Sequence, residues 1–248
     1  MNTLVCISHV PDTTAKINFT SDSRSLDAAG IQFVINPYDE FGLTKALHLK
    51  ESLGGTITVL NVGGPETEPT LRKALAIGAD QAVRIDAIPS DAITVAQNIK
   101  NHISANSYDL IICGQESIDY NGQQVPAMIA ALLQLPFTNA CVGLDLSGSE
   151  ATTKAEIDGG HAIFKANLPL VIGGKKGLVE EKDLRIPNMR GIMSARSKPL
   201  KIEVAIEGTP ATRSVSFDKP AVKTAVRMID PENVEELVRL LHEEAKAI

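Results

Sequence analysis

The sequence predicts an α/β fold with a doubly wound, mostly parallel sheet, an antiparallel extension and a C-terminal arm. Three observations support this prediction. Short apolar runs alternate with helical patterns in the first half of the chain, the order expected of strand–helix–strand units with right-handed crossovers. The runs are almost continuously apolar, as in strands covered by helices on both faces. In the second half, short runs are joined by glycine-rich turns instead.

The first two strands flank a long helix. Thr3–Ile7 is a short, nearly continuous apolar run, which predicts a strand buried on both faces. Apolar residues then recur at helical spacing from Phe41 to Leu53 and stop at Gly54-Gly55. Thr56–Val62 is the next predicted strand, and it ends in Gly63-Gly64-Pro65.

The same alternation continues to about residue 135. A helix is predicted from about Pro69 to Ile77, with proline in its first turn and Gly78 closing it. The elements expected after it are a strand at 82–85, a helix at 92–103, a strand at 110–113 and a helix at 127–135.

The second half predicts three kinds of structure. Strand-like runs at 138–144, 152–157 and 170–172 indicate an antiparallel extension of the same sheet. The polar, basic stretch 182–201 has neither a helical nor a strand period, and so long a loop is typically functional or disordered. Apolar residues on one side of the tail from 231 to 248 predict an amphipathic helix that docks on this domain or on a partner.

Composition excludes several classes of protein. The 248 residues carry a net charge of −6 and are 44% hydrophobic and only 4% aromatic, without tryptophan. This balance argues against nucleic acid as a partner. No apolar run approaches the roughly 20 residues of a membrane span, and no secretory signal is expected. Cys6, Cys113 and Cys141 lack metal-site or disulfide spacing, so we expect buried thiols and a cytoplasmic location.

A ligand site is expected where the parallel strands end. Three loops follow the carboxyl ends of predicted strands: Ser8–Asp12, Gly63–Pro65 and Gly114–Pro126. In the third loop, N–H groups around Gln124 to Met128 would start a helix and could bind a phosphate. The alternative is a polar surface loop capped by Asn121, and the spacing alone does not separate the two.

The segment Asn36-Pro-Tyr-Asp-Glu40 precedes the first helix. Asp39 is expected to cap that helix and Pro37 to preset the turn, whereas Tyr38 could stack on a flat ring. The five histidines show no metal-ligand spacing, and no nucleophile elbow is present. We therefore predict neither a metal site nor catalytic residues.

Five motifs resemble the β subunit of electron transfer flavoproteins, in the same order and over nearly the whole chain. The most specific is Glu156-Ile-Asp-Gly-Gly160 followed by Leu168-Pro-Leu-Val171. The others are Asn36–Glu40 with the helix end His48–Glu51, then Ala74–Asp80, Gln115–Asp119 and Arg190–Arg196.

The resemblance implies a Rossmann-like fold of the adenine nucleotide hydrolase-like type, in an electron carrier without catalytic activity of its own. This subunit would hold AMP and would form a heterodimer with an α subunit that holds the redox-active FAD. Electrons would come from flavin dehydrogenases and leave to an ETF–quinone oxidoreductase or another acceptor. By motif position, the cofactor-binding residues would be Cys6, Asn36, Pro37, Tyr38, Asp39, Gly63, Asp119, Asn121, Gln123, Gln124, Val125, Ala127 and Met128.

The resemblance also implies partner contacts. Residues 1–195 would form the nucleotide-binding domain, including a dehydrogenase-recognition loop at 184–196, and residues 196–248 an arm and helix docking on the α subunit. Tyr38 would lie near the isoalloxazine ring, and Met189 stands where the family usually has a leucine anchor. The partner-binding residues would be Glu156, Arg185, Met189, Ile192, Met193 and Arg196.

The chain departs from the family pattern at two places. Pro126 replaces a glycine and removes one N–H from the phosphate loop, and the usual lysine-rich stretch after Met193 is thinner. Two other functions therefore remain open. One is the small subunit of a bifurcating relative that binds a second FAD and oxidises NADH. The other is a stand-alone adenine-nucleotide-binding module of the stress-protein type.

Overall fold

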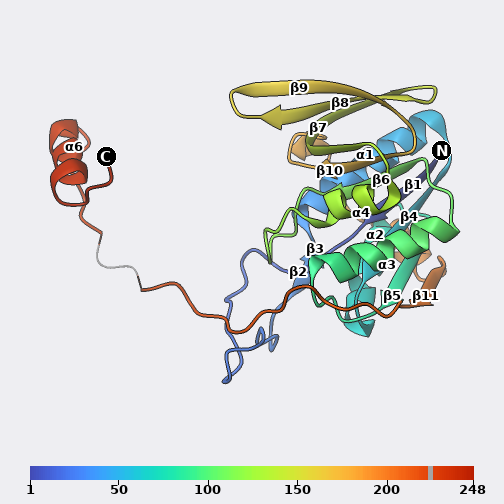
Figure 1. The fold of residues 1–248 in the computed structure, drawn as a ribbon, viewed down its shortest axis with the longest axis horizontal. Helices are drawn as coiled ribbons and strands as arrows, with labels where there is room; N and C mark the ends of the chain where they lie inside the picture. Colours follow the sequence, from blue (N-terminus) through green and yellow to red (C-terminus); the bar gives the residue numbers. More distant parts are fainter. Residues whose placement is uncertain (223–225) are drawn as a thin grey trace.

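The computed structural model describes residues 1–222 and 226–248. Residues 223–225, which belong to the predicted arm 196–248, lie outside the described residues. Figure 1 shows an α/β body, an extended segment that leaves it after β11, and the separate helix α6 near the C-terminus.

Within the described residues, nine strands form the main sheet in the order β11-β5-β4-β1-β6-β10-β7-β8-β9. Neighbouring strands run parallel from β11 to β7. The parallel strands are β1 (Asn2–Cys6), β4 (Thr56–Val62), β5 (Gln81–Asp86), β6 (Leu110–Gly114), β10 (Leu170–Gly174), β7 (Phe137–Ser147) and β11 (Leu200–Val204). This arrangement confirms the predicted doubly wound, mostly parallel sheet.

Helices cover both faces of the parallel strands. The helices α1 (Pro37–Leu53) and α2 (Glu68–Ile77) pack on one face, and α3 (Ala92–Ala105) and α4 (Val125–Leu133) on the other (Figure 1). Each face has its own apolar core, in which side chains alternate along a strand: Val5 points to the α1 side and Leu4 to the α3 side. Burial on both faces explains why these strands read as continuous apolar runs.

The antiparallel extension is confirmed for the runs 138–144 and 152–157, whereas assigning the run 170–172 to it was wrong: that run is β10, which lies between β6 and β7 and pairs parallel with both. β8 (Glu150–Ile157) pairs antiparallel with β7, and β9 (Gly160–Asn167) pairs antiparallel with β8. The sequence did not reveal β9, because its outward side chains are mostly exposed and it lacks an apolar run. Its turn at Gly159-Gly160 was the visible signal.

Five other short elements escaped prediction. β2 (His9–Pro11) and β3 (Phe33–Ile35) form a separate antiparallel pair at the base of the loop 12–32. The stretch 182–201, expected to lack regular structure, contains the 3₁₀ turn η2 (Glu181–Asp183) and the helix α5 (Met189–Ala195). A further 3₁₀ turn, η1 (Pro65–Thr67), precedes α2. All of these elements are too short to show a period in the sequence.

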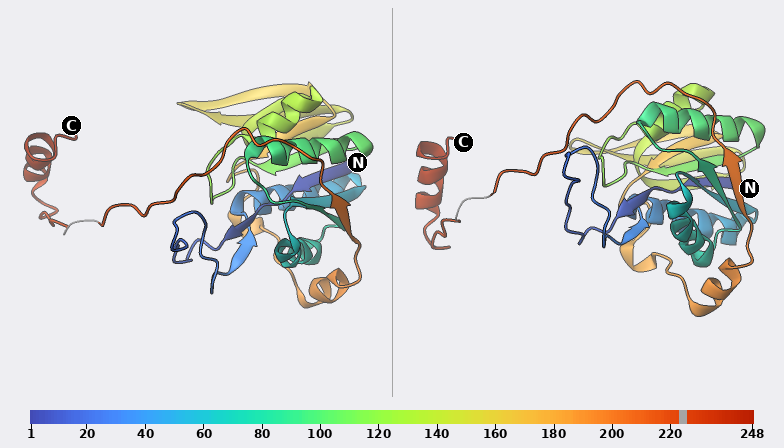
Figure 2. Two further views of the ribbon diagram at one scale, coloured as in Figure 1. Left: turned by 60° about the horizontal axis from the view of Figure 1, so that its bottom comes forward. Right: turned by 90° about the horizontal axis from the view of Figure 1, so that it is seen from below.

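The chain after residue 199 first completes the sheet and then leaves it. β11 adds an edge strand beside β5, so residues 200–204 belong to the main sheet. The segment after it crosses α3 and the loop 12–32 (Figure 2), and it ends in α6 (Val234–Glu243). The domain boundary at 195/196 stays a prediction. Among residues 1–222 and 226–248, no helix is both long and apolar enough to span a bilayer.

Candidate functional site

The three predicted loops meet at one edge of the sheet, where β1, β4 and β6 end side by side in the order β4-β1-β6. This edge, which we call the rim, is the change in winding direction at which open α/β sheets bind ligands. The predicted cofactor-binding residues all lie on these loops, at the strand ends or in the first turns of α1 and α4.

Asp39 braces the rim from within α1. The N-cap of α1 is Asn36, and Asp39 lies in the first turn, so the expectation that Asp39 caps the helix was wrong. Its carboxylate, only 3% exposed, accepts hydrogen bonds from the backbone N–H of Ser8 (2.7 Å) and of Gly114 (2.8 Å). Asp39 thereby joins the loops that follow β1 and β6.

Burial raises the pKa of Asp39 to about 7, and the two backbone N–H donors act in the opposite direction. A Cβ atom on Gly114 would collide with the Asp39 carboxylate and would also press on the Cβ of Tyr38. The glycine is therefore required for α1 to approach β6 this closely.

Asn36 makes a second set of loop contacts. Its Nδ2 donates to the carbonyl of Glu116 (2.8 Å), and its Oδ1 accepts from the N–H of Ile118 (3.2 Å). Both residues belong to the loop after β6, and Asn36 is fully buried. The polar atoms of Asn36 are thus used to hold the loop, while Pro37 and Tyr38 beside it remain only partly buried.

The segment from Asp119 to Met128 leads into α4 with few partners of its own. Asn121 and Gln123 have positive φ angles of 50° and 53°, and α4 begins after Gln124 without a side-chain cap. Asn121 therefore does not cap α4, but residues 120–124 are exposed, so the alternative of a polar surface loop stays open. Within the described chain, no backbone hydrogen bond engages the N–H of Gln124, Val125 or Ala127, so the helix start offers free donors.

Cys6 lies at the end of β1 beneath the loops, in contact with Cys113 at the end of β6. The hydrogen bond with the Cys6 thiol, together with burial, raises the pKa of Cys113 well above its ordinary value. Both thiols are buried and free, as expected. They form part of the apolar floor of the rim.

Two rim residues were not singled out from the sequence. The buried guanidinium of Arg84 donates to the carbonyl of Gly63 (3.0 Å) and pairs with Glu68 and Asp86, which fixes the loop after β4. His9 stacks on Phe33 and shares a hydrogen bond with Thr70 (2.8 Å).

His9 also faces the carboxylates of Glu66 and Asp119. Burial lowers the pKa of His9, and the two carboxylates oppose this shift. The imidazole of His9 beside the rim is therefore neutral at pH 7. His9 and Arg84 belong to no recognisable motif, so nothing in the sequence indicated that either residue lies at the rim.

The predicted recognition segment 184–196 lies on the outer side of α1 and α2, away from the rim (Figure 2). Its helix α5 exposes Met189 (75%), Ile192 (43%) and Met193 (70%) and buries only Ala195. The Nη2 of Arg185 donates to both carboxylate oxygens of Glu51 (2.8 and 3.0 Å). The structure thus brings Met189, Ile192 and Met193 together on the exposed side of one helix, while Arg185 is held against α1.

Glu156 lies elsewhere, at the end of β8, where its carboxylate pairs with Lys175 (3.0 Å).

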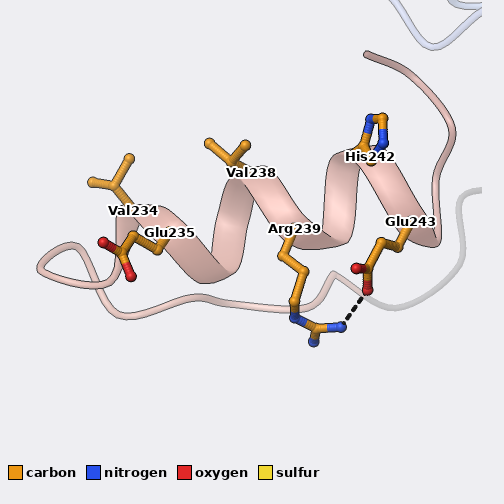
Figure 3. A pocket seen from close by; sticks show the side chains of 6 residues that line it. All are labelled: Val234, Glu235, Val238, Arg239, His242 and Glu243. Atoms are coloured by element: carbon orange, nitrogen blue, oxygen red, sulfur yellow. Dashed lines mark hydrogen bonds and ion pairs between the residues drawn. The ribbon is translucent and has the colours of Figure 1, made fainter.

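Two hollows lie away from the rim as well. One, of about 260 Å³, separates α1 from β7. The other lies along α6, where Figure 3 shows Val234 and Val238 on one side and Arg239 bonded to Glu243.

Comparison with known proteins decides the family. A family model described as "Electron transfer flavoprotein domain" matches residues 25–207, which includes most of the sheet, the loop after β6 and α5. The chain belongs to the electron transfer flavoprotein family.

Relatives match over the whole length. The electron transfer flavoprotein subunit beta of Bacillus subtilis (strain 168) is 34% identical, with 100% of both chains covered. The human protein of the same name is 27% identical over 98% of this chain and 97% of its own. The acryloyl-CoA reductase electron transfer subunit gamma of Anaerotignum propionicum is 30% identical over 96% and 97%.

The match confirms the resemblance and the fold class. The chain has the role of an electron transfer flavoprotein β subunit, and a β subunit implies an α-subunit partner. The family is associated with flavin and consists of electron carriers. The residues that bind cofactors and partners stay predictions.

Proposed function

We propose that this chain is the nucleotide-holding subunit of an electron transfer flavoprotein. It binds one AMP structurally at the rim, and the α subunit supplies the redox-active FAD. Electrons arrive from flavin dehydrogenases at the segment 184–196 and leave to an ETF–quinone oxidoreductase or another acceptor. The FAD supplies the one- and two-electron chemistry when bound, and this chain supplies position and electrostatics.

The observation that carries the proposal is the braced rim with an uncapped helix start above it. Free N–H groups at a helix N-terminus favour a phosphate, and Gln124, Val125 and Ala127 provide them. Pro126 has no N–H but sits in the first turn, where proline is tolerated. Gly63 and Cys6 lie at the neighbouring strand ends, where the ribose and base would bind. Asn36 and Asp39 fix the positions of the loops.

The nucleotide content of the purified heterodimer tests this assignment. We expect co-expression with the α subunit to yield one FAD and one AMP per heterodimer, identified by mass after denaturation. A content of two FAD and no AMP would contradict the structural AMP and would support the small subunit of a bifurcating relative that binds a second FAD. A chain that purifies alone with bound ATP would support the stand-alone module and would contradict the heterodimer.

The arm and α6 are proposed to dock on the α subunit. Val234, Leu237 and Val238 are exposed on α6, and Figure 1 shows this helix apart from the α/β body. A helix with one apolar face gains its stability from a partner surface. The pairing of Glu156 with an arginine of the α subunit is proposed on the same basis, with Lys175 as its partner in the isolated chain.

The dehydrogenase contact is proposed to centre on Met189. An exposed, flexible apolar side chain suits a surface that must fit more than one partner, and such anchors commonly dominate binding. We expect Met189→Ala in the heterodimer to raise KM for a flavin dehydrogenase about tenfold, with unchanged flavin content. Ile88→Ala, which removes an equally exposed (89%) apolar side chain outside the segment, is the matched control and should stay within about twofold.

A further inference from the structure

Neither the length of the helix α5 nor the burial of its apolar residues explains why this helix forms. It has seven residues, and isolated helices this short do not persist in water. Its larger apolar side chains point outward, and only Ala195 is buried. Something other than hydrophobic burial must hold it against the body.

Polar contacts between α2 and the end of α5 provide that support. From α2, the Nη1 of Arg72 donates to the carbonyls of Ala195 and Lys198, both at 2.8 Å. In return, the Nζ of Lys198 donates to the carbonyls of Leu75 (2.9 Å) and Ala79 (2.6 Å) at the end of α2. Each helix end therefore has carbonyls satisfied by a cation from the other segment, which is favourable at a helix C-terminus.

The two helices also approach each other closely. A Cβ atom on Gly191 would collide with the backbone carbonyl of Ala76, so only glycine permits this contact. At the other end of α5, Asn188 caps the helix by accepting from the N–H of Gly191 (2.8 Å). Figure 2 shows α5 beside α2, at the end of the segment that returns the chain to β11.

We propose that Arg72 is a positioning residue for the dehydrogenase-docking surface, acting together with Lys198. The two cations fix α5 in the docking geometry before any partner arrives, so that Met189, Ile192 and Met193 are presented without a folding cost. Pre-organisation of this kind improves affinity without adding a contact. The inference rests on the docking function proposed above.

The test uses the α–β heterodimer and a flavin dehydrogenase that reduces the wild type. In Arg72→Met we expect KM for the heterodimer to rise about fivefold or more, while kcat changes less than about twofold. Hydrogen exchange of the amides in 189–198 should become faster. Reduction by dithionite and the flavin content should stay at the wild-type level, because the rim and the FAD are untouched.

A neighbouring residue provides the matched control. Lys73 follows Arg72 on the same helix, and its Nζ pairs with Glu40 of α1 (3.1 Å). Lys73→Met removes the same charge, and its KM and exchange should match the wild type. Arg72→Lys, which keeps a cation able to reach a carbonyl, should recover part of the lost KM. Lys198→Met should reproduce the effect of Arg72→Met from the other side.

A double-mutant cycle separates this inference from the docking function itself. If Arg72 acts by placing Met189, adding Arg72→Met to Met189→Ala should cost much less than it costs the wild type. Unchanged KM and exchange in Arg72→Met, with an impaired Met189→Ala, would overturn the positioning role and leave docking intact. Wild-type KM in Met189→Ala would instead overturn the docking assignment.

Discussion

At the scale of single residues, the rim depends on side chains that no ligand need touch. Asp39 and Asn36 together make four hydrogen bonds to the backbone of two segments: one to Ser8 after β1, and three to residues 114–118 at the end of β6 and in the loop after it. Arg84 does the same for Gly63. The loops that would face a nucleotide are thus fixed by buried polar groups beneath them, and each of these groups is costly to leave unpaired.

Asp39→Asn tests whether the hydrogen bonds of Asp39 to Ser8 and Gly114 stabilise the rim. An asparagine has one acceptor oxygen, so its NH₂ group would face the N–H of Ser8 or Gly114, and one buried donor would lose its partner. We expect a loss of about 1–3 kcal/mol in the free energy of unfolding, measured by urea titration, and weaker retention of the nucleotide. A variant as stable as the wild type would contradict the brace.

The same variant tests how Asp39 makes the stability of the protein depend on pH. Asp39 has a folded pKa raised to about 7 by burial, above the ordinary value near 3.9. Between these values the folded state binds more protons than the unfolded state, so this site loses stability as the pH rises from about 4 to about 7. The difference between the two pKa values corresponds to a loss of at most about 4 kcal/mol. Asp39→Asn should remove this slope, whereas an unchanged slope would assign the pH dependence to another group.

The residue scale also shows a limit of the sequence. The position of Asp39 between proline and an apolar run indicated a helix cap, and its actual partner Gly114 lies 75 residues away. The three loops at Ser8–Asp12, Gly63–Pro65 and Gly114–Pro126 were placed correctly at one edge, because the carboxyl ends of parallel strands share one edge of a sheet. Arg84 and His9 gave no pattern, since their partners are backbone atoms and single side chains from other segments.

At the scale of elements, one carboxylate serves both a helix and the arm. Asp91 caps α3 by accepting from the N–H of Thr94 (3.0 Å) with Oδ1. Its Oδ2 accepts from the N–H groups of Ala211 (2.7 Å) and Thr212 (3.0 Å). These hydrogen bonds, chiefly the one from Thr94, lower the pKa of Asp91 to about 2, so the contacts persist above pH 4 and fail as the pH falls through 2.

Asp91→Asn separates the two roles. Asparagine remains a good N-cap, but it has no second oxygen to accept from the arm. We expect the amides of Ala211 and Thr212 to exchange faster by hydrogen-exchange mass spectrometry, while the first turn of α3 keeps its protection. Asp91→Ala should lose both. Unchanged exchange at 211–212 in Asp91→Asn would show that other contacts hold the arm.

The pattern of apolar residues decided which elements the sequence revealed. The helices α1, α2, α3 and α4 and the strands β1, β4, β5 and β6 have 5 to 17 residues, and their apolar patterns placed them within a few residues. α5 has seven residues with a glycine inside and exposed apolar side chains, so its pattern is the reverse of a buried helix. β9 is an edge strand whose side chains are largely exposed.

At the scale of the whole molecule, the predicted class of sheet was right because it follows from repeated strand–helix units. The exact strand order was not predictable. β10 inserts between β6 and β7 although β7 follows β6 along the chain, and β11 joins the far edge after a detour through α5. Both choices depend on contacts between segments more than 25 residues apart, which no local pattern encodes.

The two proposed surfaces lie on different sides of this body. The rim lies at the carboxyl ends of β4, β1 and β6, whereas α5 lies on the outer side of α2. A dehydrogenase can therefore be held at α5 without covering the loops at the rim. Separation of this kind allows the flavin-bearing partner to move while the docked enzyme stays in place.

The exposed α6 has a consequence for how the protein must be made. A helix that displays valine and leucine to water is a sticky end, prone to self-association and attractive to chaperones and proteases. Copies synthesised in excess of the α subunit would be the first to be lost. If α6 docks on the α subunit as proposed, we expect the unpaired chain to turn over faster than the heterodimer, and balanced synthesis of the two subunits to limit that loss.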